Sequence, residues 1–267
     1  MNGRRFPPPW TIPVASTPGY PTNMPNKYVG NRLLAALPEQ AIALLAPDLR
    51  QSTLPQGVVC YGAGDPIDQV YFPRTGMISL LVTTGDGDMV EISSVGCEGA
   101  VGVQCGNGPC FSFTRAIVQI GGNFWIIAAP LFEAATSRSA ELRELIFAYI
   151  ETLWAEAQQN AACNAIHDGS SRLCRWLLQC ADRTGSEQVL LIHESLAEML
   201  GVRRTTVTLL AQELQKRGIL RYSRGRITIL DRAALEACAC ECYEVIRKLS
   251  TVAVPPTLFH RSQILKD

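Results

Sequence analysis

The sequence predicts an α+β chain in which a strand-rich N-terminal part, one long helix and a helical C-terminal part follow one another. Three observations support this order. Short runs rich in Val, Ile, Tyr and Phe, separated by turn residues, occupy about 53–128. After Pro130, apolar residues recur every three or four positions over about 28 residues. Two shorter amphipathic patterns, joined by a single glycine, then follow in LAEMLGVRRTTVTLLAQEL, residues 196–214.

The length of 267 residues suits two domains, and a hydrophobic fraction of 47% is ample for packed cores. Lys+Arg and Asp+Glu both number 24, so only local clustering of charge can indicate a nucleic-acid partner. No run of 18 apolar residues and no signal-peptide pattern is present, which predicts a cytoplasmic protein without a membrane partner. The ten cysteines are then expected to be free thiols or metal ligands rather than disulfides.

The N-terminal half begins with a tail, 1–30, that contains seven prolines and is expected to be disordered. The strand-like runs that follow include QVYFPRTG, MISLLV and RAIVQIGGNFWII. The TTGDGD segment between MISLLV and MVEISSV predicts a hairpin turn. Many short, closely spaced strands favour a small antiparallel barrel or jelly roll.

The long helix is expected to start at Ser139, a typical N-cap, and to end at the Asp-Gly of His167-Asp168-Gly169. One apolar stripe is formed by Leu142, Ile146, Tyr149, Leu153 and Ala157. Leu145, Ile150 and Trp154 widen it, so the helix must be covered on two sides. A second copy of the chain can supply the second cover; alternatively, the helix lies under another lobe of the same chain.

The C-terminal part continues with an amphipathic helix, SSRLCRWLLQCADRTG, and closes with a last helix, DRAALEACACECYEVIRKL. Between them, the spacing of Ala197, Gly201 and Val207 is that of a helix-turn-helix, in which a small residue, a turn glycine and a branched residue let two helices pack closely. The second helix would present Arg203, Arg204, Thr205, Thr206 and Thr208 outward. Such N-terminal residues of a recognition helix can meet base edges and phosphates in the major groove.

The next stretch, RYSRGRITIL, places Arg221, Arg224 and Arg226 around a turn between two β-like runs, as in a basic wing. From His193 to Arg226, seven Lys or Arg stand against three acidic residues, a local net charge of +4 in a neutral chain. These residues predict salt-dependent binding to double-stranded DNA. The alternative is a winged helix that serves protein contacts, within a small-molecule or redox sensing module.

In this order, the barrel, long helix and winged helix-turn-helix resemble the Crp/Fnr family of bacterial transcription regulators over about 31–248. The specific motifs are VYFPRTGMISLL, VGCEGAVG and GVRRTTVTLLAQELQKRGILRYSRGRITILD. The resemblance implies a cyclic-nucleotide-binding-like sensor domain at 31–135, a dimerisation helix at 136–167, a winged helix-turn-helix at 168–234, and a C-terminal helix and tail at 235–267. It also implies a homodimer on a palindromic operator with half-sites roughly 34 Å apart, and RNA polymerase as a partner.

By position in the family motif, Arg204 is the base-reading arginine, while Arg203 and Thr206 would touch phosphate. Thr205 stands where many members carry a glutamate, so the operator is expected to differ from the family's usual one. In the sensor domain, members that bind cyclic nucleotides use a Gly-Glu turn and an Arg-Ser or Arg-Ala pair. Here the turn is reversed at Glu98-Gly99 and the nearest arginine, Arg115, is displaced.

Glu98, Gly99 and Arg115 are therefore candidate effector residues in a degenerate site, or they make internal turn contacts. Ser112 or Phe113 lies near the clamping position, and Ala157 and Gln158 replace the hydroxyls that hold adenine. We expect no cofactor: neither a cyclic nucleotide nor an iron–sulfur cluster.

Metal ligands are also not expected. Cys97, Cys105 and Cys110 match no ligand spacing, and of the three cysteines at 238, 240 and 242 only the first and last would share a helix face. Cys105 or Cys110 could instead be a redox-sensing thiol. The three histidines, His167, His193 and His260, lie outside the strand-rich region, and no catalytic grouping occurs, so we expect no enzyme. The operator, the sign of regulation and the effector do not follow from the sequence.

Overall fold

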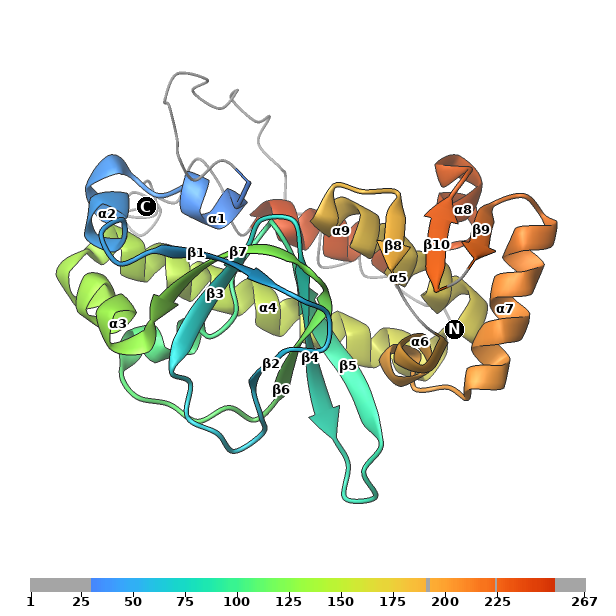
Figure 1. The fold of residues 1–267 in the computed structure, drawn as a ribbon, viewed down its shortest axis with the longest axis horizontal. Helices are drawn as coiled ribbons and strands as arrows, with labels where there is room; N and C mark the ends of the chain where they lie inside the picture. Colours follow the sequence, from blue (N-terminus) through green and yellow to red (C-terminus); the bar gives the residue numbers. More distant parts are fainter. Residues whose placement is uncertain (1–29, 191–192, 224, 253–267) are drawn as a thin grey trace, which may run out of the picture.

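The computed structural model describes residues 30–190, 193–223 and 225–252, whose elements are shown in Figure 1. In this part of the chain, seven N-terminal strands form two antiparallel sheets, with strand orders β1-β7-β3 and β2-β6-β4-β5. The predicted antiparallel jelly roll is thereby confirmed. The strands are β1 (Arg50–Leu54), β2 (Val59–Tyr61), β3 (Gln69–Pro73), β4 (Met77–Thr83), β5 (Met89–Val95), β6 (Arg115–Ile120) and β7 (Gly122–Ala128).

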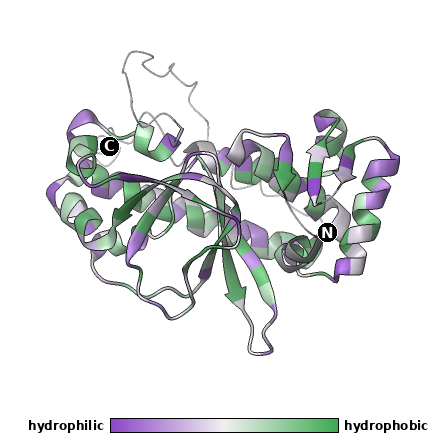
Figure 2. Cartoon of the chain, in the orientation of Figure 1, coloured by the Kyte–Doolittle hydropathy of each residue, from purple (hydrophilic) through white to green (hydrophobic). Residues whose placement is uncertain are grey.

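The β4–β5 hairpin forms where the sequence predicts it, with Thr83 paired to Met89 and Gly87 at a φ of +89° in the turn. Hydrophobic residues follow the strands of both sheets (Figure 2). Val70, Phe72, Phe124 and Ile127 are fully buried in the core of the jelly roll. Short helices complete this domain: α1 (Arg32–Ala35), α2 (Glu39–Leu45), the 3₁₀ helix η1 (Val103–Asn107) and α3 (Ala129–Arg138).

The long helix α4 (Ala140–Ile166) has 27 residues, close to the predicted length. Its N-cap is Ser139, as predicted: the Leu142 amide donates to Ser139 Oγ at 3.1 Å. Leu142, Ile146 and Tyr149 of the predicted stripe are buried against the jelly roll. The helix lies behind both sheets and extends beneath the C-terminal part (Figure 1). It therefore connects the two halves of the molecule.

The C-terminal part begins with α5 (Gly169–Thr184), separated from α4 at the predicted break. Asp168 caps its first turn, because its Oδ1 accepts from the amides of Ser170 and Ser171, and Gly185 ends it in the left-handed region. A three-stranded antiparallel sheet of order β8-β10-β9 lies beyond α5. The remaining elements are β8 (Gln188–Leu190), α6 (His193–Leu200), α7 (Arg204–Lys216), β9 (Leu220–Ser223), β10 (Arg226–Ile229), α8 (Arg232–Cys238) and α9 (Cys242–Val252).

The expectation of one continuous last helix is wrong, because the chain leaves helical geometry between α8 and α9. Ala239 is extended, with φ −76° and ψ 152°. A straight helix would place Cys240 and Cys242 on opposite faces. The break lets both be buried, at 7% and 1% exposure, together with Tyr243.

The proline-rich tail, 1–30, lies outside the described residues except for Gly30. Within the described ranges, no helix is long and apolar enough to cross a membrane.

The C-terminal part and the jelly roll share a core. Met77 and Leu81 of β4 are buried in the same apolar cluster as Leu173 and Leu177 of α5. Beside it lies the buried carboxyl of Glu91, which accepts from Trp176 Nε1 at 2.8 Å and from the Ser79 hydroxyl. Burial raises the pKa of Glu91 from 4.5 to about 7 against the lowering effect of these hydrogen bonds. The Glu91 carboxyl thus joins α5 to the jelly roll, and its burial favours the protonated form.

Because the folded state holds this proton more tightly, the free energy of unfolding should fall as the pH rises from about 4.5 to about 7. The shift corresponds to at most about 3 kcal/mol. Glu91→Gln should remove most of this dependence, as measured by urea denaturation at about pH 5 and about pH 7.5. The exposed Glu213→Gln is the control, and an unchanged pH dependence in the Glu91 variant would contradict this role for the carboxyl.

Candidate nucleic-acid interface

Helices α6 and α7 form a tight hairpin around Gly201. This glycine has a φ of +59°, a conformation that costs a residue with a Cβ roughly 1–2 kcal/mol. Leu196 and Leu200 of α6 and Val207 of α7 are buried beneath the hairpin, and Ala197 is half-buried between the helices. The predicted spacing of small, turn and branched residues therefore has the packing role expected of a helix-turn-helix.

The N-terminal end of α7 presents basic and hydroxyl side chains to solvent. Arg203, the N-cap residue, is exposed together with Arg204 and Thr205, whereas Thr206 and Thr208 are half-buried. The Thr208 hydroxyl donates to the Arg204 carbonyl at 3.1 Å, so it is engaged within the helix. The first turn has no acidic residue and no side-chain cap. The exposed helix N-terminus with its two arginines is therefore attractive to an anion.

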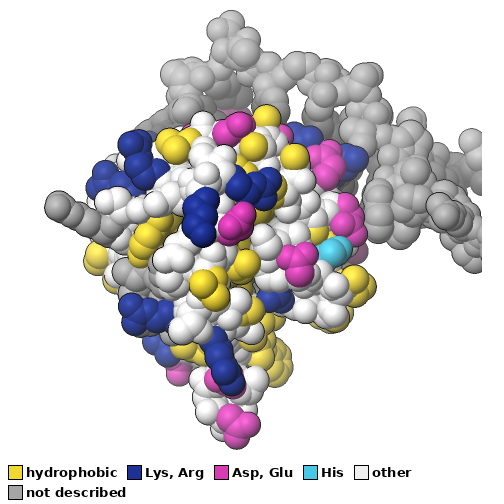
Figure 3. Space-filling view, turned by 90° about the vertical axis from the view of Figure 1, so that its right-hand side faces the viewer, with side chains coloured by type: hydrophobic (Ala, Val, Ile, Leu, Met, Phe, Trp, Pro, Cys, Tyr) yellow, Lys and Arg dark blue, Asp and Glu magenta, His cyan; other side chains and the backbone are white. Residues whose placement is uncertain are grey.

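The wing follows the C-terminal end of α7 in sequence. β9 and β10 pair in antiparallel fashion, with Arg226 opposite Ser223, and Gly225 occupies the turn with a φ of +74°. Arg221 and Arg226 are exposed, and Arg224 lies outside the described residues. Lys and Arg side chains are spread over the face that carries α7, with acidic side chains between them (Figure 3). The structure therefore exposes the basic residues of helix and wing on the C-terminal part.

In the N-terminal half, the candidate effector residues have internal partners. Glu98 is 5% exposed, and its Oε1 accepts from the Gly96 amide at 2.9 Å. A Cβ at Gly99 would overlap the Tyr149 hydroxyl of α4, which accepts from the Ala100 amide at 3.0 Å. The Glu98-Gly99 turn is thus packed directly against the long helix.

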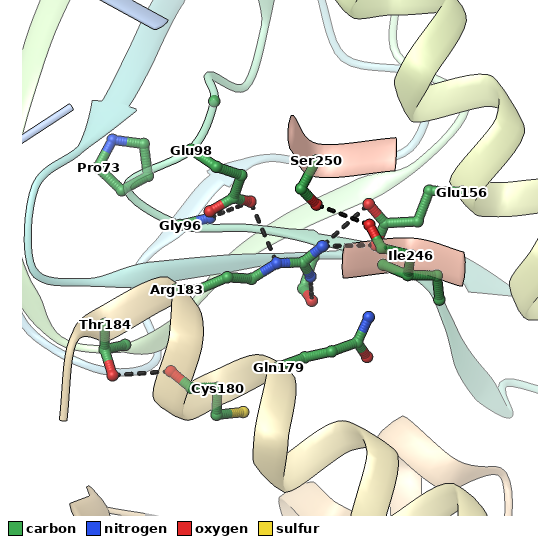
Figure 4. A network of polar contacts seen from close by, with 12 residues as sticks. Pro73, Gly96, Glu98, Glu156, Gln179, Cys180, Arg183, Thr184, Ile246 and Ser250 are labelled. Carbon is green, nitrogen blue, oxygen red and sulfur yellow. Dashed lines mark hydrogen bonds and ion pairs between the residues drawn. The ribbon is translucent and has the colours of Figure 1, made fainter. Parts of the chain in front are cut away.

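The acidic side chain of this turn meets a buried arginine of α5 (Figure 4). Arg183 Nε lies 3.1 Å from Glu98 Oε1, and Nη2 donates to both carboxylate oxygens of Glu156 in α4 at 2.8 and 2.9 Å. Nη1 donates to the Ser94 hydroxyl of β5. Burial lowers the pKa of Arg183, but the Glu156 and Glu98 carboxylates outweigh it and raise the pKa above its usual value. One guanidinium therefore joins the jelly roll, α4 and α5.

Arg115, the other candidate effector residue, lies in β6 opposite Leu81 and is half-buried. No hydrogen bond or ion pair joins it to Glu98 among the described residues. Ser112, near the position of the phosphate clamp, is buried, and its hydroxyl donates to the Thr114 carbonyl at 2.8 Å. These residues do not converge on a common site, so the arrangement does not fit a clamp for a cyclic phosphate.

The comparisons with known proteins agree with this geometry. Residues 171–238 match the family model described as the Crp-like helix-turn-helix domain. The helix-turn-helix region of the C-terminal part is therefore similar to this family, and we refer to it as the Crp-like domain. No curated protein sequence is significantly similar to the chain.

Solved structures share the fold of the Crp-like domain together with the jelly roll and long helix. FixK2 from Bradyrhizobium japonicum superposes with a TM-score of 0.62 at 17% identity, over 72% of this chain and 98% of that one. A transcriptional regulator of the Crp/Fnr family from Eubacterium rectale gives 0.57 at 19% identity, over 77% and 96%. The c-di-GMP-responsive regulator CLP from Xanthomonas campestris gives 0.57 at 16%, over 71% and 97%. The resemblance to the Crp/Fnr family is confirmed at the level of fold.

Sequence reasoning missed two features that surround the Crp-like domain. Arg183 lies in the last turn of α5, where basic residues are common, so no local sequence pattern predicts its buried ion pairs. The second feature is a cluster of Cys163, His167, Cys240 and Cys242, whose possible ligand atoms all lie within 4.8 Å of one another. The expectation of no metal site is therefore not confirmed.

Arg183→Met should lower the free energy of unfolding by about 3–5 kcal/mol, because it leaves Glu98 and Glu156 buried without their cation. Combining it with Glu98→Gln and Glu156→Gln should recover much of this loss, as measured by urea denaturation. Arg221→Met, at an exposed position, is the control and should change stability little. A single Arg183 variant as stable as the wild type would contradict the role of this residue as the link between the domains.

Proposed function

We propose that the protein is a sequence-specific DNA-binding transcription regulator. The observation that carries the proposal is the exposure of Arg203, Arg204 and Thr205 at the start of α7, the second helix of a Crp-like helix-turn-helix domain. Positive charge at a helix N-terminus is unfavourable by itself, and a polyanion offsets that cost. The solved structures of similar fold belong to transcription regulators, and we assign binding rather than a catalytic step to this chain.

Within this surface we assign a separate task to each group of residues. Arg204 reads a guanine in the major groove, and Thr205 contacts the neighbouring base pair. Arg203 and Thr206 bind phosphate, with Thr208 supporting the first turns of α7. The wing residues Arg221, Arg224 and Arg226 follow the adjacent backbone. The alternative, a winged helix used for protein contacts, does not require basic residues both at the start of α7 and in the wing.

The protein is further proposed to act as a homodimer through α4. Phe147 and Trp154 are 59% and 68% exposed and lie seven residues apart, on the side of the helix away from Tyr149. The same heptad-spaced stripe continues through Gln158, Ala161 and Ala165, small or uncharged residues that allow a second helix to approach. A two-fold axis along α4 would set two recognition helices roughly 34 Å apart on a palindromic operator.

We retain the division into a sensor domain at 31–135, a dimerisation helix at 136–167 and a DNA-binding domain at 168–234. The sensor domain would respond to a signal other than a cyclic nucleotide, because Glu98 is engaged by Arg183 and Gly99 by Tyr149. A regulator of this kind works in the cytoplasm with RNA polymerase as its partner.

Enrichment of bound sequences from a random DNA pool should yield a two-fold symmetric site. Arg204→Ala should cost about 1–3 kcal/mol at one base pair of each half-site and relax the preference there. Arg226→Ala should weaken all sequences alike and reduce the slope of log affinity against log salt by about one. Uniform weakening by the Arg204 variant would make this residue a phosphate contact, and absence of salt-sensitive binding would contradict the proposed function.

Trp154→Glu should weaken dimerisation at least about tenfold, since a large aromatic side chain in the centre of an interface often contributes more than 2 kcal/mol. Sedimentation velocity over a concentration series measures the change. Phe113→Glu is the matched control, because Phe113 is 95% exposed in a loop far along the chain from α4. Equal effects of both variants, or none from the Trp154 variant, would contradict α4 as the interface.

A further inference from the structure

Four side chains of metal-binding type converge where the long helix meets the end of the C-terminal part. Cys163 and His167 come from the last turn and C-cap of α4, Cys240 from the break between α8 and α9, and Cys242 from the first position of α9. The three cysteines are 0%, 7% and 1% exposed and form a cluster separate from both apolar cores. All are free thiols.

We propose that Cys163, His167, Cys240 and Cys242 bind one Zn²⁺ ion in a tetrahedral Cys₃His site that fastens α9 to α4. With bonds of about 2.3 Å to sulfur and about 2.0–2.1 Å to nitrogen, tetrahedral zinc separates two sulfurs by about 3.8 Å and a sulfur from a nitrogen by about 3.6 Å. The Sγ atoms of Cys163 and Cys240 are 3.5 Å apart, and Cys242 Sγ is 3.6 Å from His167 Nδ1.

These distances favour a single ion over the other chemistry open to cysteines. A disulfide would hold two sulfurs at about 2.05 Å, far closer than Cys163 and Cys240 are. An iron–sulfur cluster distributes its protein ligands over several iron atoms and so needs them further apart. Four ligand atoms within 4.8 Å of one another enclose only one ion.

The surroundings of the four ligands have the features of a metal site. His167 Nε2 lies 3.1 Å from Glu241 Oε1, so a proton on Nε2 leaves the lone pair of Nδ1 directed to the cluster. A carboxylate on the outer nitrogen is the usual partner of a zinc-bound histidine. Gln159 Nε2 also donates to Cys242 Sγ at 3.0 Å, as amides do to metal-bound thiolates.

A buried cation compensates the charge of the proposed site. Three thiolates, one neutral imidazole and Zn²⁺ leave one net negative charge, which is costly to bury alone. Arg175 of α5 is 4% exposed, and no ion pair with a carboxylate is found for it in the described ranges. Its Nη1 donates to Asn160 Oδ1 at 2.9 Å, and Asn160 lies one turn before Cys163 in α4. Arg175 therefore supplies a buried positive charge near the Cys163 end of the cluster.

The position of the site gives it a structural role. The Crp-like domain leaves α4 at Asp168, immediately after His167, and returns to α4 through α9. Zinc would thus close the domain into a loop with both ends fixed to one helix. Bound zinc would thereby fix the orientation of α7 relative to α4, and loss of zinc would remove this restraint.

The test uses the full-length protein under reducing conditions and needs no DNA, so its outcome is independent of the proposed function. Zinc content by mass spectrometry should be about one ion per chain, and Co²⁺ should give the thiolate charge-transfer and tetrahedral d–d bands of a Cys₃His site. Cys240→Ser and Cys242→Ser should lower zinc content at least about tenfold. Cys238→Ser, two residues away, should keep the ion.

Two further measurements separate a metal site from a merely packed cluster. Glu241→Ala, at a side chain 74% exposed, should weaken zinc affinity about 10–100-fold without unfolding the protein. Removal of zinc should increase amide hydrogen exchange around 239–246. Folded wild-type protein without thiolate–cobalt bands, equal loss of zinc in the Cys238 control, or exchange unchanged by zinc would each overturn the proposal.

Discussion

The guanidinium of Arg183 is the contact on which the arrangement of this molecule depends. It lies in α5, yet its partners are Glu98 of the jelly roll, Ser94 of β5 and Glu156 of α4. A buried charge without a partner is strongly destabilising, so the cation and its two carboxylates must be assembled together. The pairing of these three charges fixes α5 against both the jelly roll and the long helix. The hydrogen bond from Trp176 to Glu91 reinforces this contact.

This contact also involves the Glu98-Gly99 turn, the candidate effector turn of the sequence analysis. Glu98 faces an internal arginine rather than a solvent-filled space, and Tyr149 covers Gly99. Under the proposed function, a signal that acts on the N-terminal half would have to compete with these ion pairs or act on the long helix that carries Glu156 and Tyr149. The same residues hold the N-terminal and C-terminal parts of the chain together.

The proposed DNA-binding surface depends on local clustering of basic residues rather than on net charge. The whole sequence has 24 basic and 24 acidic residues, and two of the acidic ones, Glu98 and Glu156, pair with the buried Arg183. Arg203 and Arg204 of α7 and Arg221 and Arg226 of the wing are exposed on the Crp-like domain. A neutral protein can thus present a cationic helix end without a large repulsive charge on the rest of its surface.

Much of the architecture was determined by the sequence alone, because it depends on residues close together in the chain. The hairpin at TTGDGD, the Ser139 cap, the break at Asp168-Gly169 and the glycine turn of the helix-turn-helix are all local in this sense. Each rests on turn chemistry or periodicity that neighbours in sequence share.

Only the tertiary structure decided which distant side chains meet. Arg183 and Ser94 are 89 residues apart, and Cys163 and Cys240 are 77 apart. The cysteine cluster also depends on the break at Ala239, which periodicity does not show because CACEC continues the helical pattern on both sides. Local sequence sets the conformation of each segment, whereas a buried ion pair or a four-residue ligand cage depends on how folded segments pack against one another.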